Sequence, residues 1–149
     1  MRGASGTTIN LVISGVAARA VLWPDFAPKS VAALVQSLPL ELPLQHCKWS
    51  GPACFAELPG GAISTIEDLE TPVISIYPGV LALRPPHPGL PSGELLIAYG
   101  DAEFRMPEGR RFVTPLGEIE PGSDVFLAAL ARTATEGRAT LRLTVAEAG

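Results

Sequence analysis

Proline and glycine occur throughout the chain, with fifteen of each among its 149 residues. Proline lacks the backbone N–H that a helix interior needs, and glycine weakens a helix through its flexibility, so both interrupt long helices. Only the windows 28–38 and 123–137 combine apolar residues at helical spacing with an interior free of these breakers. We therefore predict two helices in a chain otherwise made of short strands and turns.

Apolar and polar residues alternate with a period of two in residues 9–13 and 139–145, as they do in strands with one buried face. Gly15 supplies a turn, so residues 18–23 are expected to return as the second strand of a hairpin. Further strand candidates are short apolar runs bounded by proline or glycine, namely 44–50, 53–58, 72–77, 80–84, 94–99, 103–106 and 112–119.

A sheet of so many short strands protects its edges most simply by closing on itself. We predict a mainly β protein, a closed antiparallel barrel of about eight strands with the two α-helices capping its ends. No internal repeat or linker divides the chain, so one domain is expected over residues 9–147, after a flexible N-terminus of residues 1–8.

Composition excludes several classes of protein. Hydrophobic residues make up 47% of the chain and charged residues 17%, which does not suit a disordered protein. The formal net charge of −4 offers no positive field for nucleic acid. The first residues do not resemble a signal peptide, and Ser14, Gly15 and Arg19 break the only N-terminal apolar stretch. We expect a cytoplasmic monomer or homodimer without nucleic-acid or membrane partners.

Residues that bind metals are few in this sequence. His46 and His87 are the only histidines, and Cys47 and Cys54 the only cysteines. They form no dense ligand cluster, and the chain has no nucleotide-binding fingerprint, so we expect neither a metal nor an organic cofactor. The two cysteines are interpreted as buried free thiols in preference to a disulfide.

Candidate functional residues gather in the predicted strand 44–50. Strand parity directs His46 and Lys48 to one face and Cys47 and Trp49 to the other. A neutral imidazole accepts or donates protons near neutral pH, so His46 is the first candidate for general acid–base catalysis. The alternative is that His46 and Lys48 lie on the solvated surface while Cys47 and Trp49 are core residues.

Two arginines lie at the ends of predicted strands. The guanidinium of Arg84 or Arg105 can hold a carboxylate through two parallel hydrogen bonds, although a surface arginine more commonly covers apolar surface with its stem. Glu57 follows an apolar strand and is expected to form an ion pair with one of them. Tyr99, next to Gly100, can present its hydroxyl at the rim of a pocket, with plain packing as the alternative.

Several segments resemble those of cyclophilins. Residues 26–31 (Phe-Ala-Pro-Lys-Ser-Val) resemble the turn into the first helix of that family, residues 49–55 its Lys-Gly-Ser-Cys-Phe strand, and residues 118–123 the entry to its second helix. The chain is more similar still to bacterial cyclophilin-like proteins of unknown function, through residues 46–50 (His-Cys-Lys-Trp-Ser) and the Tyr99-Gly100 pair. This resemblance implies a cyclophilin-like barrel over residues 9–145 and a functional role for residues 46–50.

The chain departs from the prolyl isomerases of that family at their catalytic cation. There, a His and an Arg follow the Cys-Phe pair and the guanidinium polarises the amide of the substrate proline, whereas Ala56 and Glu57 follow the pair here. The Gln-Gly-Gly-Asp signature of the isomerases is also missing, and residues 59–61 (Pro-Gly-Gly) are its nearest remnant. An acid in place of that cation removes or reverses the electrostatic stabilisation that the guanidinium gives to the substrate amide.

We therefore predict a cyclophilin-like protein that binds a small molecule such as a carboxylate or amide metabolite, with or without catalysis. The candidate catalytic residue is His46, and the candidate ligand-binding residues are Trp49, Ser50, Glu57, Arg84, Tyr99 and Arg105. Two alternatives stay open. One is a prolyl isomerase or peptide-binding module in which Arg84 or Arg105 supplies the cation, and the other is a regulatory or structural partner of another enzyme.

Overall fold

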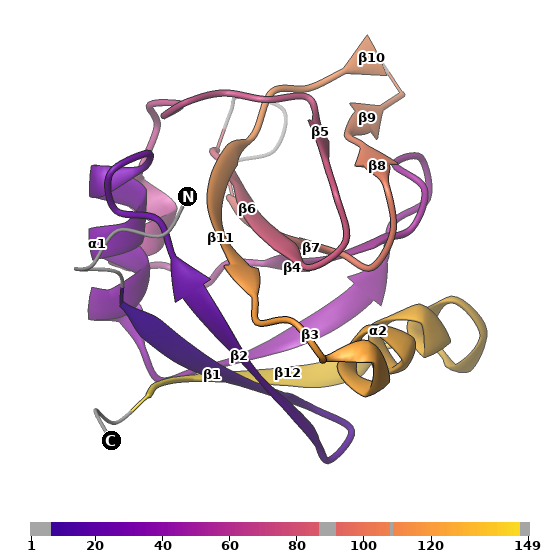
Figure 1. The fold of residues 1–149 in the computed structure, drawn as a ribbon. Coiled ribbons are helices and arrows are strands. Elements are labelled where there is room, and N and C mark those ends of the chain that lie inside the picture. The colour runs from indigo at the N-terminus through magenta and orange to yellow at the C-terminus, as the bar shows by residue number, and fades with distance from the viewer. Residues whose placement is uncertain (1–6, 87–91, 108, 147–149) are drawn as a thin grey trace.

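Eight antiparallel strands close into a barrel in the computed structural model, which describes residues 7–86, 92–107 and 109–146 (Figure 1). Around the barrel the order is β1-β12-β3-β4-β7-β6-β11-β2, so each strand pairs with a neighbour on both sides. This arrangement confirms the predicted fold class. The strands span Thr8–Ile13 (β1), Val16–Leu22 (β2), Leu40–His46 (β3), Ala53–Glu57 (β4), Val80–Arg84 (β6), Glu94–Ala98 (β7), Thr114–Ile119 (β11) and Ala139–Val145 (β12).

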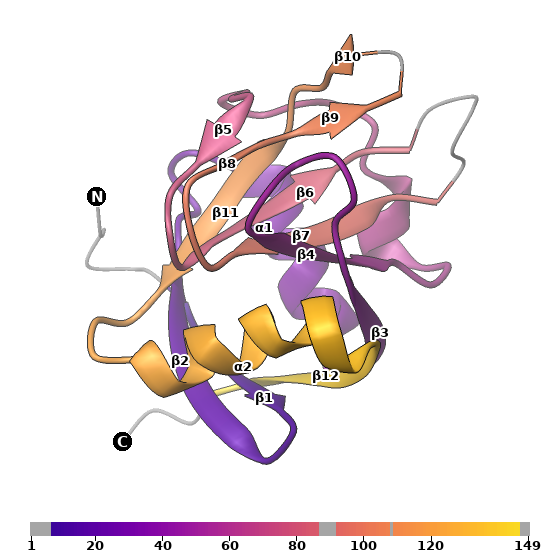
Figure 2. The same ribbon diagram turned by 90° about the vertical axis from the view of Figure 1, so that its right-hand side faces the viewer.

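The two predicted helices are present as α1 (Pro28–Ser37) and α2 (Asp124–Glu136). They lie at opposite ends of the barrel (Figures 1 and 2). Pro28 begins α1 at a position where a missing N–H breaks no helical hydrogen bond. Neither helix in the described part of the chain has the length and apolarity that crossing a membrane requires.

The barrel interior is a packed apolar core. Leu81 and Leu83 of β6 and Leu95 and Ile97 of β7 point inward and are at most 1% exposed. Alternate residues of the other strands join them, and the buried faces of both helices complete the same cluster. Burying each of these side chains contributes about 1.5–3 kcal/mol to stability.

The intervening residues of β4, β6 and β7 face outward and form a second apolar cluster. Short strands cover this outer face: β5 (Ser75–Ile76) pairs with β8 (Ala102–Glu103), and β9 (Arg105–Met106) pairs with β10 (Gly109–Arg110). They lie on the side of the barrel away from β1 and β12 (Figure 2). The strands β4, β6 and β7 are therefore covered on both faces.

Strand β11 contains both Pro115 and Gly117 and still belongs to the barrel. Its pairing with β6 shifts register between these two residues, and proline is tolerated at such an irregularity. A Cβ at Gly117 would collide with the backbone of Val21 and Leu22 on β2. Glycine is thus required here because two strands approach closely.

Three predicted strands differ from the observed ones, and the one expected over 103–106 is divided into β8 and β9, which pair with different strands. The strand expected over 44–50 is β3, which begins at Leu40 and ends at His46. Pro43 does not prevent it, because β4 pairs only with Gln45 and His46 and leaves the first part of β3 with β12 as its partner. Of the strand expected over 72–77, only β5 forms, with Val73 held by an isolated bridge to Val113.

The structure also refines the predictions for the chain ends and for the second helix. Strand β1 begins at Thr8, inside the segment expected to be flexible, while residues 1–6 and 147 lie outside the described residues. Ser123 stands at the N-cap of α2 but makes no side-chain capping bond, because its hydroxyl donates to the Glu120 carbonyl at 2.7 Å. The connection between β4 and β5 contains a single helical turn, η1 (Ala62–Thr65).

Candidate functional site

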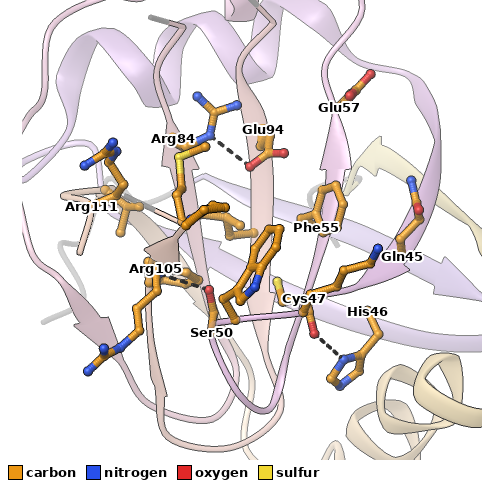
Figure 3. A pocket seen from close by; sticks show the side chains of 17 residues that line it. Gln45, His46, Cys47, Ser50, Phe55, Glu57, Arg84, Glu94, Arg105 and Arg111 are labelled. Carbon is orange, nitrogen blue, oxygen red and sulfur yellow. Dashed lines mark hydrogen bonds and ion pairs between the residues drawn. The ribbon is translucent and has the colours of Figure 1, made fainter. Parts of the chain in front are cut away.

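A cavity of about 590 Å³ opens on the outer face of strands β4, β7 and β6. The loop after β3 and the segments 104–107 and 111–113 form its other walls (Figure 3). The packed barrel interior is separate from it, so the candidate site lies outside the barrel core. The lining residues are Gln45, His46, Cys47, Lys48, Trp49, Ser50, Phe55, Glu57, Arg84, Glu94, Leu96, Phe104, Arg105, Met106, Pro107, Arg111 and Val113.

One wall of the cavity is apolar. Leu96, Phe104 and Val113 are at most 3% exposed and belong to the second apolar cluster, against which Phe55 packs. Trp49, in contrast, is 55% exposed at the same cavity. An indole left in water beside a hollow apolar wall is typical of a surface that binds another molecule.

Residues 46–49 all line the cavity, which contradicts the parity prediction that separated His46 and Lys48 from Cys47 and Trp49. Parity fails because β3 ends at His46 and the following residues leave the extended conformation. Gly51 completes this turn with a positive φ of 87°. The turn therefore brings consecutive side chains to one site.

Both ring nitrogens of His46 have partners. Nδ1 lies 2.8 Å from the Cys47 carbonyl oxygen, which only accepts, so the proton of the neutral ring belongs on Nδ1. Nε2 then accepts the Tyr99 hydroxyl, at 2.6 Å. Burial, with smaller contributions from Cys54 and Cys47, raises the pKa of Tyr99 and keeps this hydroxyl protonated. Tyr99 is not among the lining residues and reaches the site through His46.

Arg84 lines the cavity, but its guanidinium is already bound. Its side chain is 6% exposed; Nε contacts Glu94 Oε1, Nη1 the Pro85 carbonyl and Nη2 the Ser92 carbonyl, each at 2.9 Å. Arg84 therefore fixes Glu94 and both described ends of the β6–β7 connection. Its donors are directed to the protein, whereas the sequence predicted that they hold a ligand.

Arg105 is more accessible, with a side chain 49% exposed. Its Nη2 lies 2.8 Å from Glu103 Oε1, the same oxygen that Arg110 Nε contacts at 2.9 Å. One carboxylate thus serves two guanidinium groups, which leaves this side of the cavity positive. Ser50 positions the segment, because its Oγ accepts the backbone N–H of Arg105 at 3.2 Å (Figure 3).

The predicted ion pair of Glu57 with Arg84 or Arg105 is wrong. Arg84 forms its ion pair with Glu94, which lies directly opposite it in the β6–β7 pairing. Arg105 forms its ion pair with Glu103, two residues earlier in the chain. Glu57 lies opposite Glu94 in the β4–β7 pairing, so the two carboxylates share the outer face. The exposed Glu57 side chain makes no hydrogen bond or ion pair within the described residues.

Both cysteines are free in the structure. Burial, together with the nearby Cys54 and Glu94, raises the pKa of Cys47 to about 12. Burial likewise raises the pKa of Cys54 to about 11. The thiolate is the nucleophilic form, so neither thiol is activated at neutral pH.

Several lining residues went unnoticed in the sequence, above all Leu96, Phe104 and Arg111. The uninterrupted apolar run in β7 was a signal for Leu96, because a strand without polar alternation is covered on both faces. Phe104 and Arg111 come from the segment that covers the outer face of the barrel, and no local pattern indicates that packing. Within the described ranges, no group of His, Cys, Asp and Glu side chains suits a metal ion, and His87 lies outside them.

Comparison with known proteins supports the fold. The sequence profile of the family described as "Protein of unknown function (DUF3830)" matches residues 9–145, and no curated protein matches the chain. The hypothetical protein AF2241 from Archaeoglobus fulgidus has a similar structure, with a TM-score of 0.59 and 15% identity over 97% of this chain and 99% of that one. McbB, in a complex with tryptophan, gives a TM-score of 0.60 and 15% identity over 95% of this chain and 45% of McbB.

Proposed function

The chain belongs to the DUF3830 family of proteins of unknown function, and we propose that its cavity binds a small organic molecule with an apolar body and a carboxylate. One observation carries this proposal: an exposed indole, Trp49, borders a cavity whose floor is apolar and whose edge is cationic. The volume of about 590 Å³ is in the range of small-molecule sites.

The apolar floor favours a ring or branched chain in the ligand. Phe55, Leu96 and Phe104 offer carbon surface, and covering this surface removes it from water at about 25 cal/mol per Å². Trp49 adds a flat indole on which a planar group stacks. A purely polar ligand would leave this surface hydrated and gain little from it.

The cationic edge favours an anionic group. Lys48 is exposed and its ammonium has no partner within the described residues, while Arg105 shares Glu103 with Arg110. Arg111 also lines the cavity. A carboxylate that reaches any of these side chains gains charge-assisted hydrogen bonds, of which arginine supplies the bidentate form.

We assign the fold to the cyclophilin-like barrels as part of the same proposal. The order of strands and helices and the resemblance of residues 46–50 support this assignment. The position of Glu57 in the cavity, where the resemblance expects the isomerase cation, favours a binding site over prolyl isomerisation. McbB, which shares this fold over 45% of its length, forms a complex with tryptophan, and we therefore choose aromatic acids as the first ligands to test.

His46 remains the predicted proton-transfer residue if the bound molecule reacts. In the neutral tautomer with the proton on Nδ1, the lone pair of Nε2 is the proton acceptor of the ring, and the Tyr99 hydroxyl donates to it. A ligand that takes a proton to or from His46 must therefore compete with Tyr99. Catalysis would be accompanied by rotation of one of these two side chains.

Isothermal titration of the purified chain with phenylpropanoate and indole propanoate, each compared with its primary amide, tests the proposed function. We expect the acids to bind about tenfold more tightly than the amides, because only they use the cationic edge. Arg105→Ala and Lys48→Ala should reduce this preference, and Trp49→Ala should weaken acid and amide alike.

Arg138→Ala is the matched control, because Arg138 is an exposed arginine outside the cavity. It should leave both affinities unchanged. Equal affinity for acid and amide in the unmodified protein, or identical affinities in all four variants, would contradict the proposal.

A further inference from the structure

The cavity is bipolar, and we propose that its ligand is a zwitterion in which an apolar segment separates a carboxylate from an amine. This inference rests on the proposed function and adds a second recognition point, Glu57, for the cationic end.

Two arginines and one glutamate of the lining lie on opposite sides of the cavity. Figure 3 shows Arg105 and Arg111 on one side and Glu57 with Gln45 on the other, with Phe55 toward the Glu57 side. Arg105 and Arg111 come from the segment that crosses the strands, and Glu57 from β4. A ligand that spans the cavity therefore meets positive charge at one end, carbon in the middle and negative charge at the other end.

Glu57 is the acid that is available to a ligand. All three guanidinium nitrogens of Arg84 donate, to Glu94, Pro85 and Ser92, so this guanidinium compensates Glu94 and makes no bond to Glu57 within the described residues. Glu57 is paired directly opposite Glu94 and has no side-chain partner within the described residues. Two like charges facing each other across a strand pair are unfavourable, and a bound cation relieves this repulsion.

Gln45 strengthens the cationic end. It pairs with Phe55 across β3 and β4 and lines the cavity on the same side as Glu57 (Figure 3). Its side-chain carbonyl accepts a hydrogen bond, as the Glu57 carboxylate does, while an ammonium supplies three donors. The two side chains together suit a primary amine better than a second carboxylate, which Glu57 repels.

A matched pair of ligands isolates the amine. Para-aminomethyl phenylpropanoate and para-ethyl phenylpropanoate share the ring and the carboxylate and differ only in an ammonium that replaces a methyl group. Titration of the unmodified chain should show about fivefold tighter binding of the amine, the size expected of a partly exposed charge pair. Glu57→Gln should abolish this preference without weakening the ethyl compound.

Glu67→Gln is the control variant, because it removes one exposed carboxylate outside the cavity and should keep the preference. Equal binding of the two acids to the unmodified chain, or a preference that survives Glu57→Gln, would overturn the zwitterion inference and leave the carboxylate site standing. Failure of both acids to bind would overturn the proposed function and this inference together.

Discussion

The two faces of strands β4, β7 and β6 have different roles although they are built from the same residues in alternation. The inner face carries Leu83, Leu95 and their neighbours, packed against both helices and closed to solvent. The outer face carries Leu96 and Phe55 beside Glu57, Glu94 and Arg84, under a cover that leaves a cavity. One set of strands therefore provides both the stable core and the wall of the candidate site.

The comparison teaches that position relative to the pleat decides what a residue contributes. An inward leucine loses all contact with water and its removal leaves a void that neighbouring strands cannot fill. An outward leucine at the cavity borders space that solvent or ligand already occupies. Stability should therefore depend mainly on the inner face and affinity mainly on the outer face.

The largest expected effect comes from Leu95→Ala compared with Leu96→Ala, two adjacent leucines of β7 that are 1% and 3% exposed on opposite faces. We expect Leu95→Ala to lower the free energy of unfolding by about 3–4 kcal/mol and Leu96→Ala by about half as much. Urea unfolding of both variants measures the difference. Leu96→Ala should weaken binding of phenylpropanoate, and equal destabilisation by the two changes would show that the faces are not distinct.

A smaller effect is expected at the ion pair on the outer face. Arg84→Met leaves the Glu94 side chain, 17% exposed, without its cation, and should lower the free energy of unfolding by about 2 kcal/mol. Adding Glu94→Leu should recover part of this loss, because the unpaired charge is then gone. If Arg84→Met instead abolished ligand binding at unchanged stability, Arg84 would be a ligand-binding residue, as the sequence predicted.

The smallest effect concerns the N-terminus of α1, which closes one end of the barrel. Glu70 accepts the backbone N–H groups of Ser30 at 2.8 Å and Lys29 at 3.1 Å. Burial alone would raise the pKa of Glu70, but these hydrogen bonds outweigh it and hold the pKa below the usual 4.5. Glu70→Gln should cost about 1 kcal/mol at neutral pH.

The sign of the pH dependence follows from the lowered pKa of Glu70. The unfolded chain binds the proton first as pH falls, so the stabilisation by Glu70 is complete above about 4.5 and is lost as pH falls through the lower pKa of the folded state. Thermal unfolding between neutral and acidic pH should show a shallower decline for Glu70→Gln than for the unmodified chain. Parallel curves would refute the role of this carboxylate.

The sequence was a good guide to the barrel because its interior follows a pattern with a local cause. The alternation in residues 139–145 and the helical spacing in 28–38 arise from burial of one face, and both elements are present as β12 and α1. Predictions failed where pairing mattered. The strand expected over 44–50 begins already at Leu40, because the limited reach of β4 along β3 makes Pro43 acceptable within it.

The candidate site was predicted in part. His46, Trp49, Ser50, Glu57, Arg84 and Arg105 all line the cavity, while Tyr99 contacts it through His46. Which charges pair was not readable, because Glu94 reaches Arg84 through strand register and not through spacing along the chain. No local sequence pattern indicates that the segment with Phe104 and Arg111 packs on the outer face of the barrel.

The two tryptophans stand in opposite environments, which gives the molecule two intrinsic fluorescent reporters. Trp23 is 8% exposed and packs edge-on against Phe26, with ring centroids 6.2 Å apart, so its emission belongs to a dry, rigid setting. Trp49 is 55% exposed at the cavity and emits from water. We therefore expect occupation of the cavity to shift the red part of the emission spectrum and unfolding to shift the blue part, so a single fluorescence measurement distinguishes ligand binding from unfolding.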